Sequence, residues 1–176
     1  MFRTTQYFRL TNEEERHRGF QYKDGLNVDV HRFHPYGQCQ EGGLYFFSRE
    51  EMWKYPSYIG GADKVHWVRE VTLPDDAKVH LEDGKRKVDR FVLGPRQRFD
   101  PYAFFTQNYT RDEKLKAVKK KGHSIQYFVY SATEEMKWEA LKQDGTSIYY
   151  FVDSATEEMK LEAVKKNAHS IQYFVD

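Results

Sequence analysis

Cysteine is almost absent from this chain, since Cys39 is the only one among 176 residues. A single cysteine excludes any disulfide bond within the chain and is typical of a protein that stays in a reducing compartment. Long apolar runs are absent too. None approaches the ~18 residues that a membrane-spanning helix requires, and the first ten residues lack the apolar segment of a signal peptide. We therefore expect a soluble protein with no membrane span.

An excess of one charge is also missing, because 28 lysines and arginines face 27 aspartates and glutamates. Proteins that bind nucleic acid or anionic membranes usually carry a clear basic excess, so the composition argues against both classes. Aromatic residues, in contrast, make up 16% of the chain. They bury large areas and allow a real core despite the high charge content, which argues against intrinsic disorder.

The last third of the chain consists of tandem copies of a 23-residue unit. The copies align without gaps, and the linker SATEEM separates them at residues 131–136 and 154–159. The three aligned segments are 114–130 (KLKAVKKKGHSIQYFVY), 137–153 (KWEALKQDGTSIYYFVD) and 160–176 (KLEAVKKNAHSIQYFVD). Such close similarity between neighbouring copies predicts a helical repeat architecture.

Each unit is interpreted as a helix, a break and a short second helix. Ser131 and Ser154 each precede a glutamate by three residues, which predicts a capping box at the start of the first helix. The helix is expected to end near residues 144–145 and 167–168, where Gly or Asn can adopt the left-handed conformation. Ile148 and Phe151 predict the short second helix, although a β-strand competes there because the segment is rich in β-branched and aromatic residues.

Residues 1–100 lose the helical period and predict a small α+β domain dominated by strands, followed by the helical repeats at 101–176. A helix is expected after Ser48, which has the S-x-x-E pattern with Glu51. Short apolar or alternating runs separated by turn residues predict strands at 4–10, 43–47, 67–73, 78–81 and 91–93.

The third repeat ends without a polar cap, although a row of helical repeats usually needs one. Its apolar surface is therefore predicted either to bind a protein partner or to self-associate; the alternative is a frayed end. The candidate partner-binding residues are Trp138, Ile171, Tyr173, Phe174 and Val175.

His31, His34 and Cys39 lie in a turn-rich segment and have side chains that ligate zinc. A structural zinc site needs four ligands, and only the distant His17 could supply the fourth. The alternative is a polar loop with a buried thiol, and we expect no metal.

The segment from Gly42 to Phe47, followed by a helix and a strand, is similar to the central segment of the ADP-ribosyltransferase family. In that family a strand tyrosine stacks on nicotinamide, a histidine holds the ribose and a glutamate assists cleavage. The resemblance places Tyr45, His17 and Glu70 in these roles and implies NAD as cofactor. The alternative is a core strand whose glycines permit a tight entry turn.

Lys85, Arg86, Lys87 and Arg90 form a basic cluster in the sequence. Such a cluster can contact phosphate or an acidic partner. A charged hairpin edge that discourages aggregation explains the same pattern.

The 23-residue unit resembles a short helical repeat of uncharacterised proteins from bacteria and from large DNA viruses of amoebae. The segments 22–27 (YKDGLN), 39–46 (CQEGGLYF) and 71–77 (VTLPDDA) resemble an N-terminal domain of the same giant-virus proteins. These resemblances imply a viral origin but transfer no catalytic residues. We therefore expect a non-enzymatic structural or protein-interaction protein, associated with the virion or capsid or present in the host cytoplasm and without a cofactor. The ADP-ribosyltransferase-like enzyme is the alternative.

Overall fold

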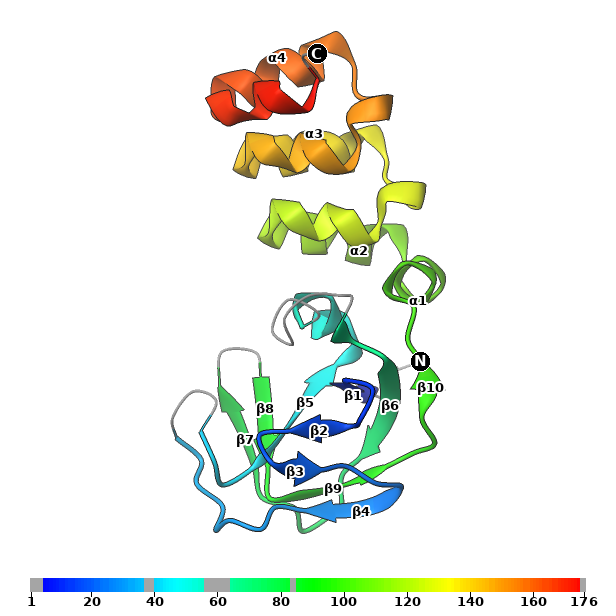
Figure 1. Cartoon of the computed structure of the whole chain (residues 1–176), viewed down its shortest axis with the longest axis vertical. Coiled ribbons are helices and arrows are strands. Elements are labelled where there is room, and N and C mark those ends of the chain that lie inside the picture. Colours follow the sequence, from blue (N-terminus) through cyan, green and yellow to red (C-terminus); the bar gives the residue numbers. More distant parts are fainter. Residues whose placement is uncertain (1–4, 37–39, 56–63, 83–84, 175–176) are drawn as a thin grey trace. The chain divides into compact units, whose positions relative to one another are not determined.

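The chain divides into two compact units, Met1–Asp100 and Pro101–Asp176. They are seen in a computed structural model that describes residues 5–36, 40–55, 64–82 and 85–174 (Figure 1). The first unit contains the strands and the second contains the α-helices. The chain is therefore of the α+β class.

The first unit is built on an eight-stranded sheet in which neighbouring strands run antiparallel. The strand order is β4-β9-β6-β1-β5-β8-β7, with β10 also paired to β6, while β2 and β3 form a separate hairpin. The strands are β1 (Tyr7–Thr11), β2 (Arg16–His17), β3 (Phe20–Gln21), β4 (Gly25–Val28), β5 (Leu44–Ser48), β6 (Trp67–Thr72), β7 (Val79–Glu82), β8 (Lys85–Val88), β9 (Arg90–Leu93) and β10 (Gln97–Arg98).

The apolar core of this unit lies around the central strands and is rich in aromatic rings. Phe46 of β5 meets Phe91 of β9 edge-on, with ring centroids 6.4 Å apart. The core residues are Tyr22, Leu44, Phe46, Val71, Val88, Phe91 and Leu93. Because side chains alternate along a strand, Leu44 and Phe46 enter this core while Tyr45 between them points to the other face of β5.

A buried ion-pair network ties β6 to the loops of the first unit. Arg69 donates to both carboxylate oxygens of Glu15 and to the carbonyl oxygen of Gly94, and it also pairs with Asp24. Arg69 and Glu15 are both buried. A bidentate arginine–carboxylate pair satisfies two charges that would be costly to bury alone, so it fixes the loop before β2 against the sheet.

The helix predicted after Ser48 is present as the 3₁₀-helix η1 (Arg49–Lys54), but the Ser48 side chain does not cap it. The S-x-x-E pattern therefore located the helix and misassigned the role of the serine.

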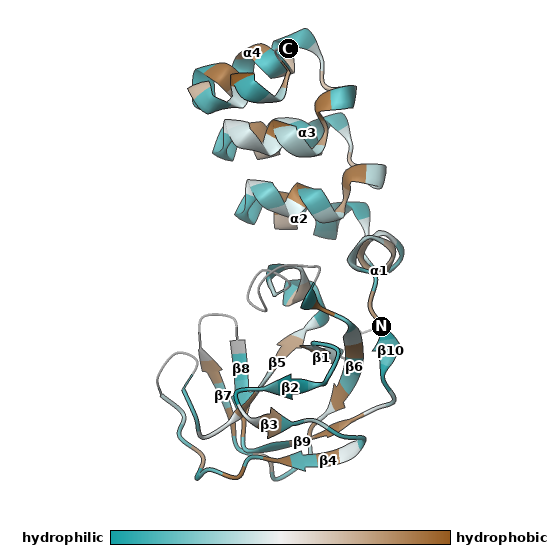
Figure 2. Cartoon of the chain, in the orientation of Figure 1, coloured by the Kyte–Doolittle hydropathy of each residue, from teal (hydrophilic) through white to brown (hydrophobic). Residues whose placement is uncertain are grey.

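The second unit begins with α1, and three similar α-helices follow, each succeeded by 3₁₀ segments. In Figure 1 the helices α2, α3 and α4 follow one another in chain order, and in Figure 2 hydrophilic and hydrophobic positions mix along each of them. The elements are α1 (Pro101–Asn108), α2 (Arg111–Lys120), η4 (Gly122–Tyr127), η5 (Val129–Ser131), α3 (Glu134–Gln143), η6 (Gly145–Tyr150), η7 (Val152–Ser154), α4 (Glu157–Lys166) and η8 (Ala168–Tyr173).

The second helix of each copy is a 3₁₀-helix rather than an α-helix or a strand. Ile148 lies within η6, and Phe151 is the residue at which η6 ends. Both are buried.

The repeat helices are capped by threonine and not by the predicted serines. Thr133 accepts from the backbone N–H of Met136, and Thr156 accepts from that of Met159. The prediction of caps at Ser131 and Ser154 was wrong because these serines end the preceding 3₁₀ turns. Their hydroxyls donate to carbonyl oxygens three residues earlier in the chain.

The predicted left-handed helix ends are also wrong, because the capping residues Asp144 (φ −150°) and Asn167 (φ −152°) are extended. The glycine after the helix serves close packing between copies instead. A β-carbon at Gly145 would lie 2.2 Å from the carbonyl oxygen of Ala163 in the next copy. At Gly122 the corresponding distance is 2.8 Å. The third copy has alanine, Ala168, at this position.

Candidate functional site

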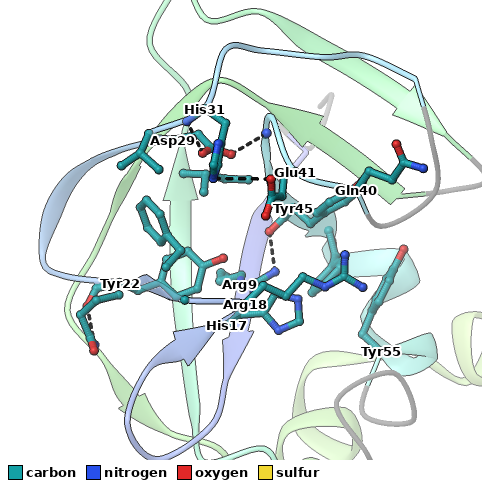
Figure 3. Close-up of a pocket in the computed structure, with 17 residues that line it drawn as sticks. Arg9, His17, Arg18, Tyr22, Asp29, His31, Gln40, Glu41, Tyr45 and Tyr55 are labelled. Carbon is teal, nitrogen blue, oxygen red and sulfur yellow. Dashed lines mark hydrogen bonds and ion pairs between the residues drawn. The ribbon is translucent and has the colours of Figure 1, made fainter.

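A cavity of about 490 Å³ opens in the first unit, beside the start of β5. It lies between β1, the β2–β3 hairpin, the segment after β4, and residues near β5 and η1. Figure 3 shows 17 residues that line it. Its aromatic lining residues are Phe20, Tyr22, Tyr45, Phe47 and Tyr55. A volume of this size falls within the ~300–1,000 Å³ of small-molecule sites.

The β2–β3 hairpin places two basic residues at this cavity. Arg18 (φ 49°) and Gly19 (φ 82°) form its two-residue turn, and both have positive φ as a type I′ turn requires. His17 pairs with Phe20 across the hairpin and therefore lies directly before the turn. His17, Arg18 and Gly19 all line the cavity.

His17 lies in a positive electrostatic environment even though the residue as a whole remains exposed. Desolvation of the imidazole, followed by the charges of Arg9 and Arg18, lowers the pKa of His17 to about 4. The imidazole is therefore neutral at pH 7 and can donate or accept a hydrogen bond.

The other end of the cavity is acidic, and its carboxylates already have partners. Asp29 accepts from the backbone N–H groups of His31 and Gly43. Glu41 lies 3.8 Å from the imidazole of His31. Figure 3 shows this group apart from Arg9, His17 and Arg18.

Two of the three residues suggested by the ADP-ribosyltransferase resemblance line this cavity, namely Tyr45 and His17. Glu70 does not line it; it lies exposed on β6, opposite Phe8 of β1. The structure therefore does not bring the proposed catalytic glutamate to the other two. Sequence reasoning missed Arg9 and Tyr22, since Arg9 is a single charge inside an apolar strand and its partners are distant in sequence.

The metal candidates are only partly covered by the structure, because Cys39 lies outside the described residues. His31 contacts Glu41, and Nδ1 of His34 lies 2.8 Å from the carbonyl oxygen of Tyr36. Among the described residues, no three His, Cys, Asp or Glu side chains are arranged to hold a metal ion.

The basic cluster is dispersed by the β7–β8 hairpin at the sheet edge. Successive residues of β8 point to opposite faces, so Arg86 and Lys87 separate. Arg86 donates to Glu51, and the fully buried Lys87 donates to the carbonyl oxygen of Glu41. Arg90 pairs with two aspartates, Asp76 and Asp89. The side chain of Lys85 lies outside the described part of the chain.

The outer surface of the third repeat exposes positions that are buried in the first two copies. Ile171 is 48% exposed, whereas its equivalents Ile125 and Ile148 are fully buried. The loss of burial in the third copy is smaller at Lys160, Val164 and Phe174. These residues are half-buried, whereas their equivalents in the first two copies are buried. We call Lys160, Val164, Ile171 and Phe174 the terminal surface.

The remaining predicted partner-binding residues lie elsewhere or are not described. Tyr173 belongs to a row of rings, with its ring centroid 5.1 Å from that of Tyr149, which in turn contacts Tyr150. Trp138 lies on α3 of the second repeat and is half-buried. Val175 lies outside the described residues.

Three proteins of Acanthamoeba polyphaga mimivirus are similar to part of this chain. An uncharacterised protein, R869, is 44% identical over 72 residues, which cover 40% of this chain and 48% of that protein. A protein provisionally named ankyrin repeat protein R868 is 43% identical over 72 residues, covering 40% and 33%. A third, provisionally named ankyrin repeat protein R896, is 36% identical over 70 residues, covering 39% and 19%.

The matches extend over half or less of each relative, so these proteins contain regions without a counterpart here. They support a giant-virus origin for the chain. An ankyrin repeat has about 33 residues, whereas the spacing here is 23, so the name is not transferred to this repeat. No family profile and no solved structure matches the chain. In the described part of the chain, no helix has the length and apolarity needed to span a bilayer.

Proposed function

We propose that the chain is a non-enzymatic viral protein that binds a protein partner through the terminal surface of its repeat unit. The observation that carries the proposal is the change in burial of one position between copies. Ile125 and Ile148 are buried in η4 and η6, which pack against the helix of the following copy as well as that of their own, while Ile171 is exposed. Exposed apolar surface next to polar residues is typical of protein-binding sites.

The internal junctions indicate what kind of partner fits this surface. Within the chain, η6 is covered by α4 and η8, which together form a helix pair. The proposed partner therefore presents a helical segment with apolar side chains toward Ile171 and Phe174.

A second copy of this chain fits the terminal surface poorly in the geometry of the internal junctions. The carbonyl oxygen of Ala163 approaches Gly145 so closely that a β-carbon there would clash. Ala168 carries such a β-carbon at the equivalent position. The opposite end of the repeat unit is also occupied, because Phe105 of α1 packs against Tyr127 and Phe128. The proposal therefore favours a different protein over self-association.

The viral setting of the proposal is supported by the relatives, all three of which are proteins of Acanthamoeba polyphaga mimivirus. The finer proposal is that binding occurs in the virion or in the host cytoplasm. Mass spectrometry of purified particles and of cytoplasm from infected amoebae tests the location separately from the binding.

Site-specific crosslinking tests the binding itself. A photoreactive amino acid at position 171 is expected to give one crosslinked partner in extract from infected amoebae. The same group at Val28, an exposed apolar residue of the first unit, serves as the matched control. Phe174→Asp is expected to abolish the adduct. A chain that crosslinks equally from both positions, or only to itself, would contradict the proposal.

A further inference from the structure

The cavity of the first unit contains a buried cation without an anionic partner among the described residues. Arg9 on β1 is 4% exposed. One terminal nitrogen, Nη1, donates to the carbonyl oxygen of Tyr45 over 2.8 Å, and the guanidinium carbon lies 4.6 Å from the ring centroid of Tyr22. Its Nε is buried and has no hydrogen-bond partner. A buried charge is costly unless it is paired and hydrogen-bonded.

A second arginine, on the neighbouring strand β6, lies beside Arg9. Arg9 lies directly opposite Arg69 in the β1–β6 register, so both side chains leave the sheet on the same face. Arg69 is paired with Glu15 and Asp24. Arg96 also lies 3.5 Å from Glu15. These two carboxylates therefore pair with two other arginines, and neither forms a described ion pair with Arg9.

The β2–β3 hairpin adds further positive charge at the same end of the cavity. Arg18 lies at its turn and, like Arg9, lines the cavity. Desolvation of the His17 imidazole, followed by the charges of Arg9 and Arg18, lowers its pKa to about 4. The acidic groups at the other end are engaged by backbone N–H groups and by His31. Between the two ends, the walls are formed by tyrosine and phenylalanine rings.

We propose that this cavity binds a small planar anion, an aromatic ring that carries one phosphate or carboxylate group. The anionic group binds Arg9 and Arg18, and the ring lies among Tyr22, Tyr45 and Tyr55. The ligand would supply the counter-charge that the fold does not provide for Arg9. Arginine forms bidentate bonds with either type of oxyanion, and aromatic walls favour a planar ring. The proposal is independent of partner binding by the repeats.

Calorimetric titration of the full chain tests both halves of the proposal. Adenosine monophosphate represents a ring phosphate and indole-3-carboxylate a ring carboxylate; adenosine and inorganic phosphate each lack one half. At least one of the first two is expected to bind at low salt, and more weakly at high salt. Which of them binds identifies the type of anion. Adenosine lacks the charged hydrogen-bonding group, and inorganic phosphate lacks the ring contacts. Each is therefore expected to bind at least about tenfold more weakly.

Variants then assign the binding to these arginines. Arg18→Gln, at an exposed turn residue, is expected to weaken binding about tenfold or more, as the loss of a charge-assisted hydrogen bond would. Arg98→Gln, a matched change on β10, is expected to leave it unchanged, because Arg98 packs over Trp67 and does not line the cavity. Arg9→Gln is expected to abolish binding, with circular dichroism as the check on folding. The proposal fails if neither ring anion binds, if inorganic phosphate binds as well as they do, or if Arg18→Gln binds normally.

Discussion

Substituting alanine for Gly145 is expected to loosen the junction between the second and third repeats. The new β-carbon would lie 2.2 Å from the carbonyl oxygen of Ala163, whereas ordinary contacts begin near 3.4 Å. The two backbones must therefore separate by roughly 1 Å, and a gap of that size forfeits a quarter to a half of the dispersion energy across the junction. Overpacking of this kind costs typically 1–3 kcal/mol, and the severity of the clash leads us to expect about 2 kcal/mol.

Two further variants at the equivalent positions serve as references for this effect. Gly122→Ala is expected to cost less than Gly145→Ala, because its closest backbone contact is 2.8 Å rather than 2.2 Å. Ala168→Gly removes a β-carbon that packs against no further copy among the described residues, so only the small backbone-entropy cost of about 0.4–1 kcal/mol is expected.

Hydrogen exchange followed by mass spectrometry provides the measurement, with urea unfolding as the global check. In Gly145→Ala, faster exchange is expected in peptides from α4 and η6, while the sheet of the first unit exchanges as before. Equal exchange in Gly145→Ala and the unchanged chain would refute the argument that glycine is required for close approach. An equally large effect of Ala168→Gly would refute it as well.

Three other predictions test the first unit and the caps. Replacing Arg69 by Met is expected to leave buried Glu15 without its main partner and to cost about 3–5 kcal/mol in urea unfolding; a loss below 1 kcal/mol would contradict this. The imidazole of His17 is expected to titrate near pH 4 by NMR. Because the unfolded chain binds this proton near pH 6.5, stability should fall as the pH drops from about 6.5 to 4, and His17→Gln should lack this contribution; titration near 6.5 would contradict it. Thr156→Ala is expected to destabilise the start of α4 by about 1 kcal/mol, and Ser154→Ala by less, as measured by exchange of the first-turn amides; the reverse order would restore the serine as the cap.

The sequence allowed the larger elements to be predicted because their patterns are local. Five apolar runs became β1, β5, β6, β7 and β9. The strands that were missed are short or charged, such as β8 with the sequence KRKV. Such a strand is specified by pairing with its neighbours, which periodicity within one segment does not reveal.

The 23-residue period correctly predicted a helix in each copy, but the residues that cap and end these helices were assigned wrongly. Ser131 and Thr133 are both good capping residues, and only the preceding 3₁₀ turn decides between them. Gly145 likewise has two common roles, a left-handed helix end or a close contact. The contact with Ala163 is specified by packing between copies, so it could not be deduced from the segment alone.

The candidate site residues also divide into those that a local sequence pattern identifies and those that only the fold reveals. Tyr45 was identified from its glycine-flanked strand, and the structure places it at the cavity. Arg9 was not identified, because its significance depends on Arg69 across the sheet and on Tyr22 from another segment. Buried charge is visible only when the fold shows which charges lack a partner.

The presence of glycine after the first two repeat helices and of alanine after the third has a consequence for how such genes change in length. Duplication of the middle copy would preserve glycine at each interior junction, since Gly145 would be copied with it. Duplication of the third copy would place Ala168 at an interior junction, where its methyl group meets a backbone carbonyl. We expect homologous arrays to lengthen by duplication of copies that carry glycine at this position rather than of copies that carry alanine.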